Sequence, residues 1–215
     1  MYCIIGMARS ATTSAFYWLN LALGRTGKYP EFTDFQNNGE VFTHLPNLEA
    51  QIGKYTMLLE QNPLPTVKLL TFTDAIIPLF LHNRQYRSVV ILPESLKEVV
   101  LRNAVAIVAQ DWTGEQSIRE ERRKSLIGTL EVNEDTIAYF KLLHDRLLQY
   151  AKLADYVFFS QDIVNDPNAN FLTPLGLPNL GPRALNVYTK HTMDNRAMLR
   201  DSTAFDEMCA KCGVV

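Results

Sequence analysis

The chain has 215 residues, of which 47% are hydrophobic and 20% are charged. A chain of this length and composition can bury a substantial core, which excludes disorder as its main state and favours one domain over residues 1–215. The 21 Lys and Arg residues nearly balance 23 Asp and Glu residues. The resulting net charge of −2 argues against a nucleic-acid partner and against a polybasic membrane-binding surface.

Hydropathy and cysteine content suggest where such a chain would reside. No apolar run approaches the ~18–20 residues that a membrane-spanning helix needs. The three cysteines, Cys3, Cys209 and Cys212, are too few and too unevenly spaced for a disulfide framework. The pair Cys209 and Cys212 also lacks the further ligands that a zinc site requires. We therefore expect a soluble cytoplasmic protein without a metal site.

Four short apolar segments are typical of buried β-strands. None has the polar residues at alternate positions that mark a strand with one face in water, so we expect all four strands to be covered on both faces. The segments are Tyr2–Ile5, Val67–Phe72, Ser88–Leu92 and Tyr156–Phe159.

Helical patterns lie between these segments, at residues 12–23, 74–82, 95–110 and 135–153. In the third, Ser95 and Glu98 have the spacing of a capping box. In the fourth, a 3.6-residue period predicts one buried face, formed by Ile137, Phe140, His144, Leu147, Leu148 and Ala151. Residues 113–134 and 165–200 are rich in charges or in Pro, Asn and Gly, and we expect them at the surface. Alternating strands and helices predict a three-layer α/β/α fold with a mainly parallel central sheet.

The segment after the first strand, Gly6 to Ser14, has the composition of an anion-binding turn. Ligands of parallel sheets bind at the carboxyl ends of the strands, often against a helix N-terminus. Arg9 offers a fixed positive charge, and Ser10, Thr12, Thr13 and Ser14 offer hydroxyl groups. The same residues could instead form an ordinary helix cap. The loop is not a Walker A motif, because Gly-x-x-x-x-Gly-Lys-Ser/Thr is absent.

This loop resembles the 5′-phosphosulfate-binding loop of sulfotransferases that use 3′-phosphoadenosine 5′-phosphosulfate (PAPS). That family usually has Pro-Arg/Lys-Ser-Gly-Thr-Thr, whereas this chain has Ala8 in place of the proline and Ala11 in place of the glycine. An alanine in the glycine position suits the loop only if its φ angle stays negative.

Three further segments resemble the same family. Residues 67–70 and 86–92 are similar to its middle strands, and residues 155–178 are similar to a late stretch that reads "Glu-Asp-Leu…Asp-Pro…Leu-Gly-Leu-Pro". The resemblance covers nearly the whole chain and implies a P-loop NTPase-like fold.

The resemblance also implies a reaction, the transfer of a sulfuryl group from PAPS to a hydroxyl or amine. The 5′-phosphosulfate would be bound by Arg9, Ser10, Ala11, Thr12, Thr13 and Ser14, and Arg9 would also stabilise charge on the leaving group. The two positions that hold the 3′-phosphate in the family are Glu94 and Arg102 here. Arg102 is the candidate ligand, with Ser95 or Lys97 as alternatives. An ionised Glu94 would repel the phosphate, so the site could also have lost this function.

For the general base there are two candidates. Glu40 resembles an acidic residue that some sulfotransferases place after the first helix, and His44 lies in a Thr-His-Leu-Pro segment found at another point of the chain in cytosolic sulfotransferases. The segment could equally be a structural turn. Residues 26–65 would line the pocket of a small-molecule, saccharide or lipid acceptor. A basic residue near the C-terminus would cover the cofactor, as Arg183, Lys190 or Arg196 could.

Two other functions are compatible with the sequence. A P-loop-type small-molecule kinase would use ATP and Mg²⁺ and would need no 3′-phosphate site. A degenerate, non-catalytic member of the family would bind an anion or a protein partner without turnover.

Overall fold

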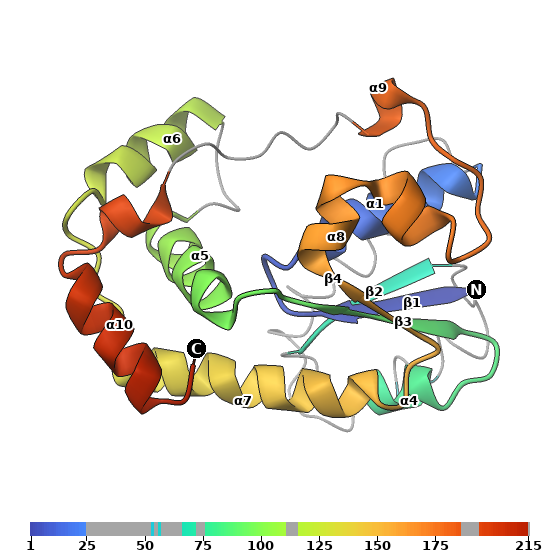
Figure 1. Ribbon diagram of the computed structural model, residues 1–215, viewed down its shortest axis with the longest axis horizontal. Coiled ribbons are helices and arrows are strands. Elements are labelled where there is room, and N and C mark those ends of the chain that lie inside the picture. The colour runs from blue at the N-terminus through green and yellow to red at the C-terminus, as the bar shows by residue number, and fades with distance from the viewer. Residues whose placement is uncertain are drawn as a thin grey trace. The chain divides into compact units, whose positions relative to one another are not determined.

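The computed structural model of this chain describes residues 1–24, 53, 56, 66–71, 76–110, 116–185 and 194–214. Contacts within the chain define two compact units (Figure 1). Unit 1 comprises Met1–Leu92 and Arg146–Tyr188, and unit 2 comprises Pro93–Asp145 and Thr189–Val215. The assignment of residues 1–215 to a single sulfotransferase-like domain stays a prediction.

Unit 1 contains a parallel four-stranded sheet with the order β2-β1-β3-β4. All three pairings between neighbouring strands are parallel, which confirms the predicted α/β class. The strands coincide with the four predicted segments to within two residues, and they are β1 (Tyr2–Gly6), β2 (Thr66–Leu70), β3 (Arg87–Leu92) and β4 (Tyr156–Phe159).

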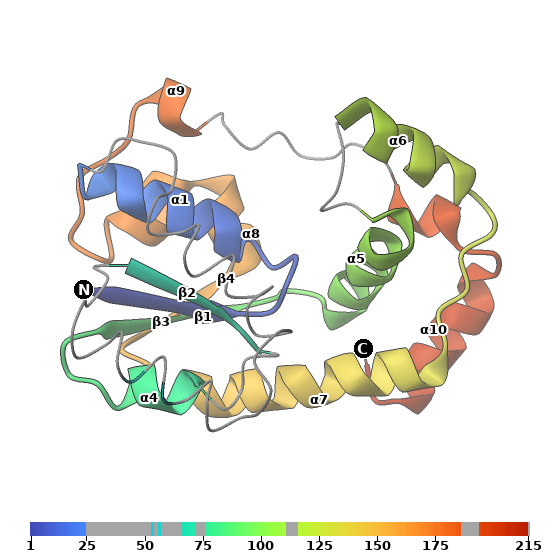
Figure 2. The same ribbon diagram turned by 180° about the vertical axis from the view of Figure 1, so that it is seen from behind.

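Helices lie on both faces of this sheet. Figures 1 and 2 show α1 and α8 on one face and α4 on the other. One of the described helices is shared between unit 1 and unit 2. The other described helical elements of unit 1 are α1 (Thr12–Ala22), α4 (Ile77–Leu81), α8 (Ser160–Asn165), the π-helix η2 (Asn168–Leu172) and α9 (Pro182–Leu185). The prediction that this α/β fold is of the P-loop NTPase-like type stays a prediction from the sequence.

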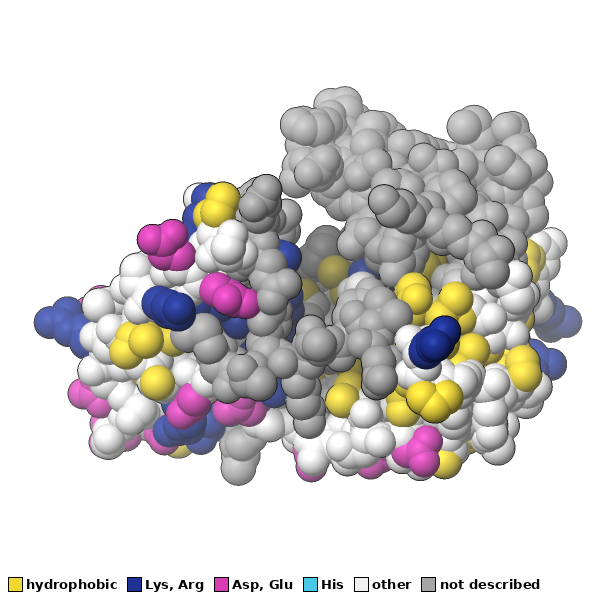
Figure 3. All heavy atoms as spheres, turned by 90° about the horizontal axis from the view of Figure 1, so that it is seen from above, with side chains coloured by type: hydrophobic (Ala, Val, Ile, Leu, Met, Phe, Trp, Pro, Cys, Tyr) yellow, Lys and Arg dark blue, Asp and Glu magenta, His cyan; other side chains and the backbone are white. Residues whose placement is uncertain are grey.

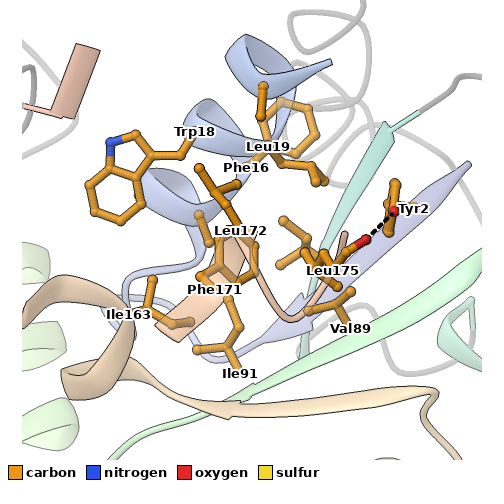
Figure 4. Close-up of a cluster of buried hydrophobic side chains, with 13 residues drawn as sticks. Tyr2, Phe16, Trp18, Leu19, Val89, Ile91, Ile163, Phe171, Leu172 and Leu175 are labelled. Atoms are coloured by element: carbon orange, nitrogen blue, oxygen red, sulfur yellow. Dashed lines mark hydrogen bonds between the residues drawn. The ribbon is translucent and has the colours of Figure 1, made fainter. Parts of the chain in front are cut away.

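A hydrophobic cluster fixes α1 on the sheet (Figure 4). The Tyr2 hydroxyl at its edge donates a hydrogen bond of 3.3 Å to the carbonyl oxygen of Leu175. The members labelled in the figure are Tyr2, Phe16, Trp18, Leu19, Val89, Ile91, Ile163, Phe171, Leu172 and Leu175. The expectation that residues 165–200 lie at the surface is therefore wrong in part, because Phe171, Leu172 and Leu175 are buried beneath α1. Their burial depends on β1, β3 and α1, which a local polar composition cannot reveal.

The fourth strand also departs from expectation. Val157 is 42% exposed and Phe159 is 50% exposed, so β4 is not covered on both faces. Among the described strands β4 pairs with β3 alone and forms an edge of the sheet. An apolar run of four residues predicts a strand but does not distinguish an edge from a central position.

Unit 2 is formed mainly by helices. They are α5 (Leu96–Ala109), α6 (Gln116–Ser125), most of α7 (Glu134–Ala151), the 3₁₀ turn η3 (Asn195–Met198) and α10 (Ser202–Lys211). Ser95 is the N-cap of α5, and its hydroxyl oxygen accepts a hydrogen bond of 3.3 Å from the Glu98 amide, as the capping pattern predicts.

The buried face of α7 is shifted from the predicted one. Ile137, Phe140 and Leu147 are buried as expected, but Leu148 is 39% exposed and Leu143 is buried in its place. His144, which was placed on the buried face, is half-buried, and desolvation lowers the pKa of its imidazole. The 3.6-residue period therefore predicted the helix correctly, but the buried face of the helix is rotated by part of a turn from the predicted face.

Polar contacts connect the helices of unit 2. The Asp206 carboxylate on α10 lies 3.3 Å from Lys97 Nζ on α5 and 2.6 Å from Arg196 Nη2 on η3. Lys211 donates a hydrogen bond of 2.7 Å to Glu134 at the start of α7. Seen from above, side chains of both charges mix over unit 2, whereas hydrophobic side chains gather over α1, α8 and α9 of unit 1 (Figure 3). None of the helices in the described ranges is long and apolar enough to cross a membrane.

Candidate functional site

The candidate site lies where the chain changes direction across the sheet of unit 1. From β1 the chain passes through α1 to β2 on one side, whereas β3 lies on the other side of β1 and is followed outward by β4. The carboxyl ends of β1 and β3 therefore form a topological switch point, where open parallel sheets bind their ligands. The loop at residues 7–11, predicted to bind an anion, leaves β1 at this point.

Gly6 allows this loop to fold tightly back against the sheet. A Cβ atom at Gly6 would lie 2.5 Å from Cγ2 of Thr12 and 3.1 Å from the carbonyl oxygen of Ile91. Thr12 is buried, and its methyl group occupies the space that any side chain at Gly6 would need. The close approach of loop, helix and strand thus requires glycine here.

The backbone of the loop is strained at two residues. Arg9 has a φ of 65° and Ala11 a φ of 58°, and they are the only two non-glycine residues of unit 1 with positive φ in the described ranges. Ala11 therefore does not meet the condition, a negative φ, under which an alanine suits the glycine position of the sulfotransferase loop. Left-handed backbone costs an L-residue about 1–2 kcal/mol, so the surrounding fold must hold both residues in this conformation.

This strain gives the loop an alternating backbone. The φ angle is positive at Arg9 and Ala11 and negative at Ala8, Ser10 and Thr12. Where φ alternates in sign, successive N–H groups can point into one concavity, which is how backbone "nests" bind anions. The loop therefore has a conformation that suits an anion, although it lacks the glycines that usually allow it.

Ser10 has a structural role in the loop. Its side chain is buried, and its hydroxyl donates a hydrogen bond of 2.6 Å to the carbonyl oxygen of Met7. The Ser10 amide donates to the same oxygen at 3.4 Å, which closes a turn with Arg9 at its third position. The Ser10 hydroxyl therefore helps to hold the loop in this conformation, and the assignment of Ser10 to the 5′-phosphosulfate stays a prediction.

The start of α1 follows directly on this turn. Its N-cap is Ala11, which has no side chain to cap the helix, and its first turn holds no acidic residue. The first amides of a helix have no partner within the helix and carry a partial positive charge. Thr13 and Ser14 are half-buried at this end, and residues 7–22 contain no Asp or Glu. The region is therefore electrostatically suited to an anion.

Lys68 adds a second cation that the sequence analysis did not identify. It lies in β2 opposite Ile4, and its Nζ donates a hydrogen bond of 3.0 Å to the Thr13 hydroxyl. Desolvation lowers the pKa of its ammonium group to about 8. A lysine inside an otherwise apolar strand segment, Val67-Lys68-Leu69-Leu70, was the available signal, because such a position normally holds an apolar residue.

The residues proposed for the 3′-phosphate lie in unit 2. Glu94 is exposed. Arg102 is on an exposed part of α5, with its Nε 3.8 Å from the Glu98 carboxylate one turn earlier. Of the alternatives, Ser95 caps α5 and Lys97 pairs with Asp206. The assignment of Arg102 to the 3′-phosphate stays a prediction.

Other predicted residues are placed as follows. Arg196 forms an ion pair with Asp206, and that hydrogen bond raises the pKa of its guanidinium. Arg183 is exposed on α9. Glu40, His44 and Lys190 lie outside the described residues, as does the predicted acceptor segment 26–65 apart from two isolated positions.

The cysteines provide no metal site in the described part of the chain. Burial raises the pKa of the Cys3 thiol and that of the Cys209 thiol. Within the ranges that the structure describes, no three His, Cys, Asp or Glu side chains are grouped so that they could hold a metal ion.

Comparisons with known proteins leave the family of the chain open. No family model matches the sequence, and neither a curated protein nor a solved structure matches it.

Proposed function

We propose that this protein is a sulfotransferase that binds the 5′-phosphosulfate of PAPS at the loop between β1 and α1 and transfers the sulfuryl group to a hydroxyl or amine. The proposal joins the sequence resemblance of residues 6–14 to the position of that loop at the switch point of the sheet. PAPS would supply an activated sulfuryl group.

The observation that carries the proposal is the alternating sign of φ along the loop, which the fold maintains although Ala11 does not meet the condition of a negative φ. In the sulfotransferase motif this position is usually glycine, and in this chain the alanine adopts a φ of 58°, a conformation that glycine favours. A helix cap without a ligand would not need such a conformation, because an N-cap residue ordinarily has extended φ and ψ angles. Strain of this kind is typical of ligand-binding turns.

The charges around the loop support the same ligand. Arg9 is permanently protonated, and Lys68 lies within hydrogen-bond distance of Thr13. Phosphosulfate is an anion, and the amides at the start of α1 favour negative charge. These groups fit the phosphosulfate part of PAPS.

Each group would have a distinct task in the reaction. The loop amides and the Thr13 and Ser14 hydroxyls would hold and orient the anion, and Arg9 and Lys68 would stabilise the negative charge that develops on the leaving oxygen. The base that removes the acceptor proton would be Glu40 or His44, as the sequence suggests.

Calorimetric titration tests this proposal. We expect adenosine 3′,5′-bisphosphate to bind the full-length protein, and ATP with Mg²⁺ to bind weakly or not at all. Binding of ATP with Mg²⁺ alone would favour the kinase, and binding of neither nucleotide would favour the degenerate family member.

Variants locate the binding at the loop. Arg9→Ala should weaken the affinity for the bisphosphate about 10- to 100-fold, as expected for the loss of a charge-assisted hydrogen bond. The matched control is Arg84→Ala, which removes an exposed arginine that precedes β3 at the amino end of the sheet. Equal affinity of both variants would refute the assignment of the loop.

A further inference from the structure

The face of β4 that points away from α1 is apolar and exposed. Side chains alternate along a strand, and Tyr156 and Phe158 pack against the cluster beneath α1, so Val157 and Phe159 point to the opposite face of the sheet. Both of these side chains are exposed. Among the described strands β4 pairs with β3 alone, so the outer edge of β4 offers backbone N–H and C=O groups for pairing with a further strand.

The outer edge of β4 lacks the residues that usually prevent strands of different molecules from pairing. Native edge strands carry charged side chains or proline for this purpose. The segment Tyr156–Gln161 contains no charged residue and no proline. Two further exposed apolar side chains flank the strand, Leu153 before it and Val164 on α8. An edge of this composition favours association with another strand over exposure to water.

The residues of β4 are complementary to those of a second copy of β4 that runs in the antiparallel direction. With Phe158 on a two-fold axis, Val157 of each copy lies opposite Phe159 of the other, on the same face of a continuous sheet. A β-branched side chain opposite an aromatic ring is a favourable cross-strand pair. Because a two-fold axis uses the same edge in both copies, association through β4 ends at the dimer.

The charges at the two ends of β4 favour the antiparallel direction. Lys152 is exposed where the chain enters the strand, and Asp162 and Asp166 are exposed where the chain leaves it. The Asp155 carboxylate is directed toward β3, where it accepts hydrogen bonds of 2.6 and 2.9 Å from Ser88. Antiparallel pairing places the entry end of one strand beside the exit end of the other, which brings opposite charges together. Parallel pairing would bring like charges together.

We propose that two copies of this chain form a dimer through antiparallel pairing of β4, which joins their sheets into one. Leu153 and Val164 extend the contact beyond the strand. Stable interfaces bury about 1,200–2,000 Å² in total, and a strand of 4 residues supplies only part of that area, so we expect a reversible dimer with a Kd in the micromolar range. The pairing uses no residue of the loop at residues 7–11, so the dimer is independent of the proposed sulfotransferase function.

Sedimentation equilibrium of the full-length protein between about 1 and 300 µM tests this proposal. Wild type should change from monomer to dimer over this range. Val157→Glu should raise the Kd of the dimer about tenfold or more, because it places a carboxylate opposite the Phe159 ring of the second copy. Leu142→Glu is the matched control, because it replaces an apolar side chain of similar exposure on α7 in unit 2, and it should leave the Kd unchanged.

Charge reversal tests the antiparallel direction. Lys152→Glu and Asp162→Lys should each raise the Kd about three- to tenfold, because every contact between charges occurs twice in a two-fold dimer. The double variant Lys152→Glu with Asp162→Lys restores opposite charges at both ends and should return the Kd close to that of wild type. Both positions are exposed, so these variants keep the test decisive if thermal unfolding shows that Val157→Glu is not folded.

Three results would overturn the proposal. A wild type that stays monomeric throughout this range would leave the outer edge of β4 to a strand of a different protein. Equal Kd values for Val157→Glu and Leu142→Glu would place the interface of the dimer elsewhere. A double charge variant that associates no more tightly than the two single variants would exclude the antiparallel arrangement.

Discussion

Gly6 and Thr12 are packed so closely that a single methyl group cannot be added between them. The Cγ2 atom of Thr12 lies 2.5 Å from the position that a Cβ atom of residue 6 would occupy. This contact holds the end of β1 against the start of α1 and so sets the path of the five-residue loop between them. The loop conformation is therefore fixed by packing inside unit 1.

Gly6→Ala should lower the free energy of unfolding by about 1–3 kcal/mol, the usual cost of overpacking. Urea denaturation measures this change. The double variant Gly6→Ala with Thr12→Ser removes the clashing methyl group and should recover part of the loss. Gly181→Ala is the control, because no atom lies within 4 Å of a Cβ at that position. If the two alanine variants were equally stable, the close contact would not be present in solution.

Ala11→Gly should raise the free energy of unfolding by about 0.5–1 kcal/mol. Glycine removes the cost of left-handed backbone, about 1–2 kcal/mol, and part of that gain is offset by the greater freedom of glycine in the unfolded chain. Ala138→Gly, at an exposed position of α7, should instead destabilise the protein by about 1 kcal/mol. A loss of stability in the Ala11 variant would contradict the positive φ.

Asp155→Ala should reduce stability by about 1–3 kcal/mol, because it leaves a buried donor without an acceptor. The Asp155 carboxylate accepts hydrogen bonds of 2.6 Å from the Ser88 amide and 2.9 Å from the Ser88 hydroxyl, and Ser88 is buried. Denaturant unfolding measures this loss of stability. Glu207→Ala, which removes an exposed carboxylate on α10, is the control for a general loss of charge. Similar denaturation midpoints for the two variants would show that the hydrogen bonds between Asp155 and Ser88 contribute little to stability.

Lys68→Met should make the free protein more stable at pH 7, by about 1–2 kcal/mol after allowance for its partial exposure. The folded-state pKa of Lys68 is lowered to about 8 from an ordinary value of 10.5, so folding carries the full cost of the buried charge below pH 8. That cost declines as the pH rises from 8 to 10.5, because the folded protein then releases a proton that the unfolded chain keeps. The difference in melting temperature between Lys68→Met and wild type should therefore be smaller at pH 10 than at pH 7. Lys152→Met, at an exposed lysine after α7, should show no such trend.

Asp206→Asn should lower the melting temperature at pH 7, and this deficit should be smaller at pH 2.5. The hydrogen bond from Arg196 and the charge of Lys97 lower the pKa of the Asp206 carboxyl below its ordinary value of 3.8. The stabilisation is therefore complete above that ordinary value and disappears as the pH falls through the lower folded-state pKa. Calorimetric melting curves at the two pH values, with Glu207→Gln as the neighbouring control, measure the effect. A deficit as large at pH 2.5 as at pH 7 would assign the loss to packing.

Short apolar runs in the sequence predicted the positions of the four strands of unit 1, and their alternation with helices predicted the parallel sheet, although β4 is covered on one face only. The capping pattern of Ser95 and Glu98 predicted the start of α5, because it depends on residues three apart in the chain. The loop at residues 6–14 was identified as a candidate anion site in the same way, from a local motif.

Tertiary structure alone decided the features that depend on distant residues. Lys68 and Thr13 are 55 residues apart and meet only because β2 pairs with β1 beneath α1. The positive φ of Ala11 depends on packing that overrides the preference of alanine, and the exposure of Phe159 depends on the place of β4 at the sheet edge. The sequence by itself determined the local elements and the position of the loop. The order of the strands then determined which cation lies beside that loop.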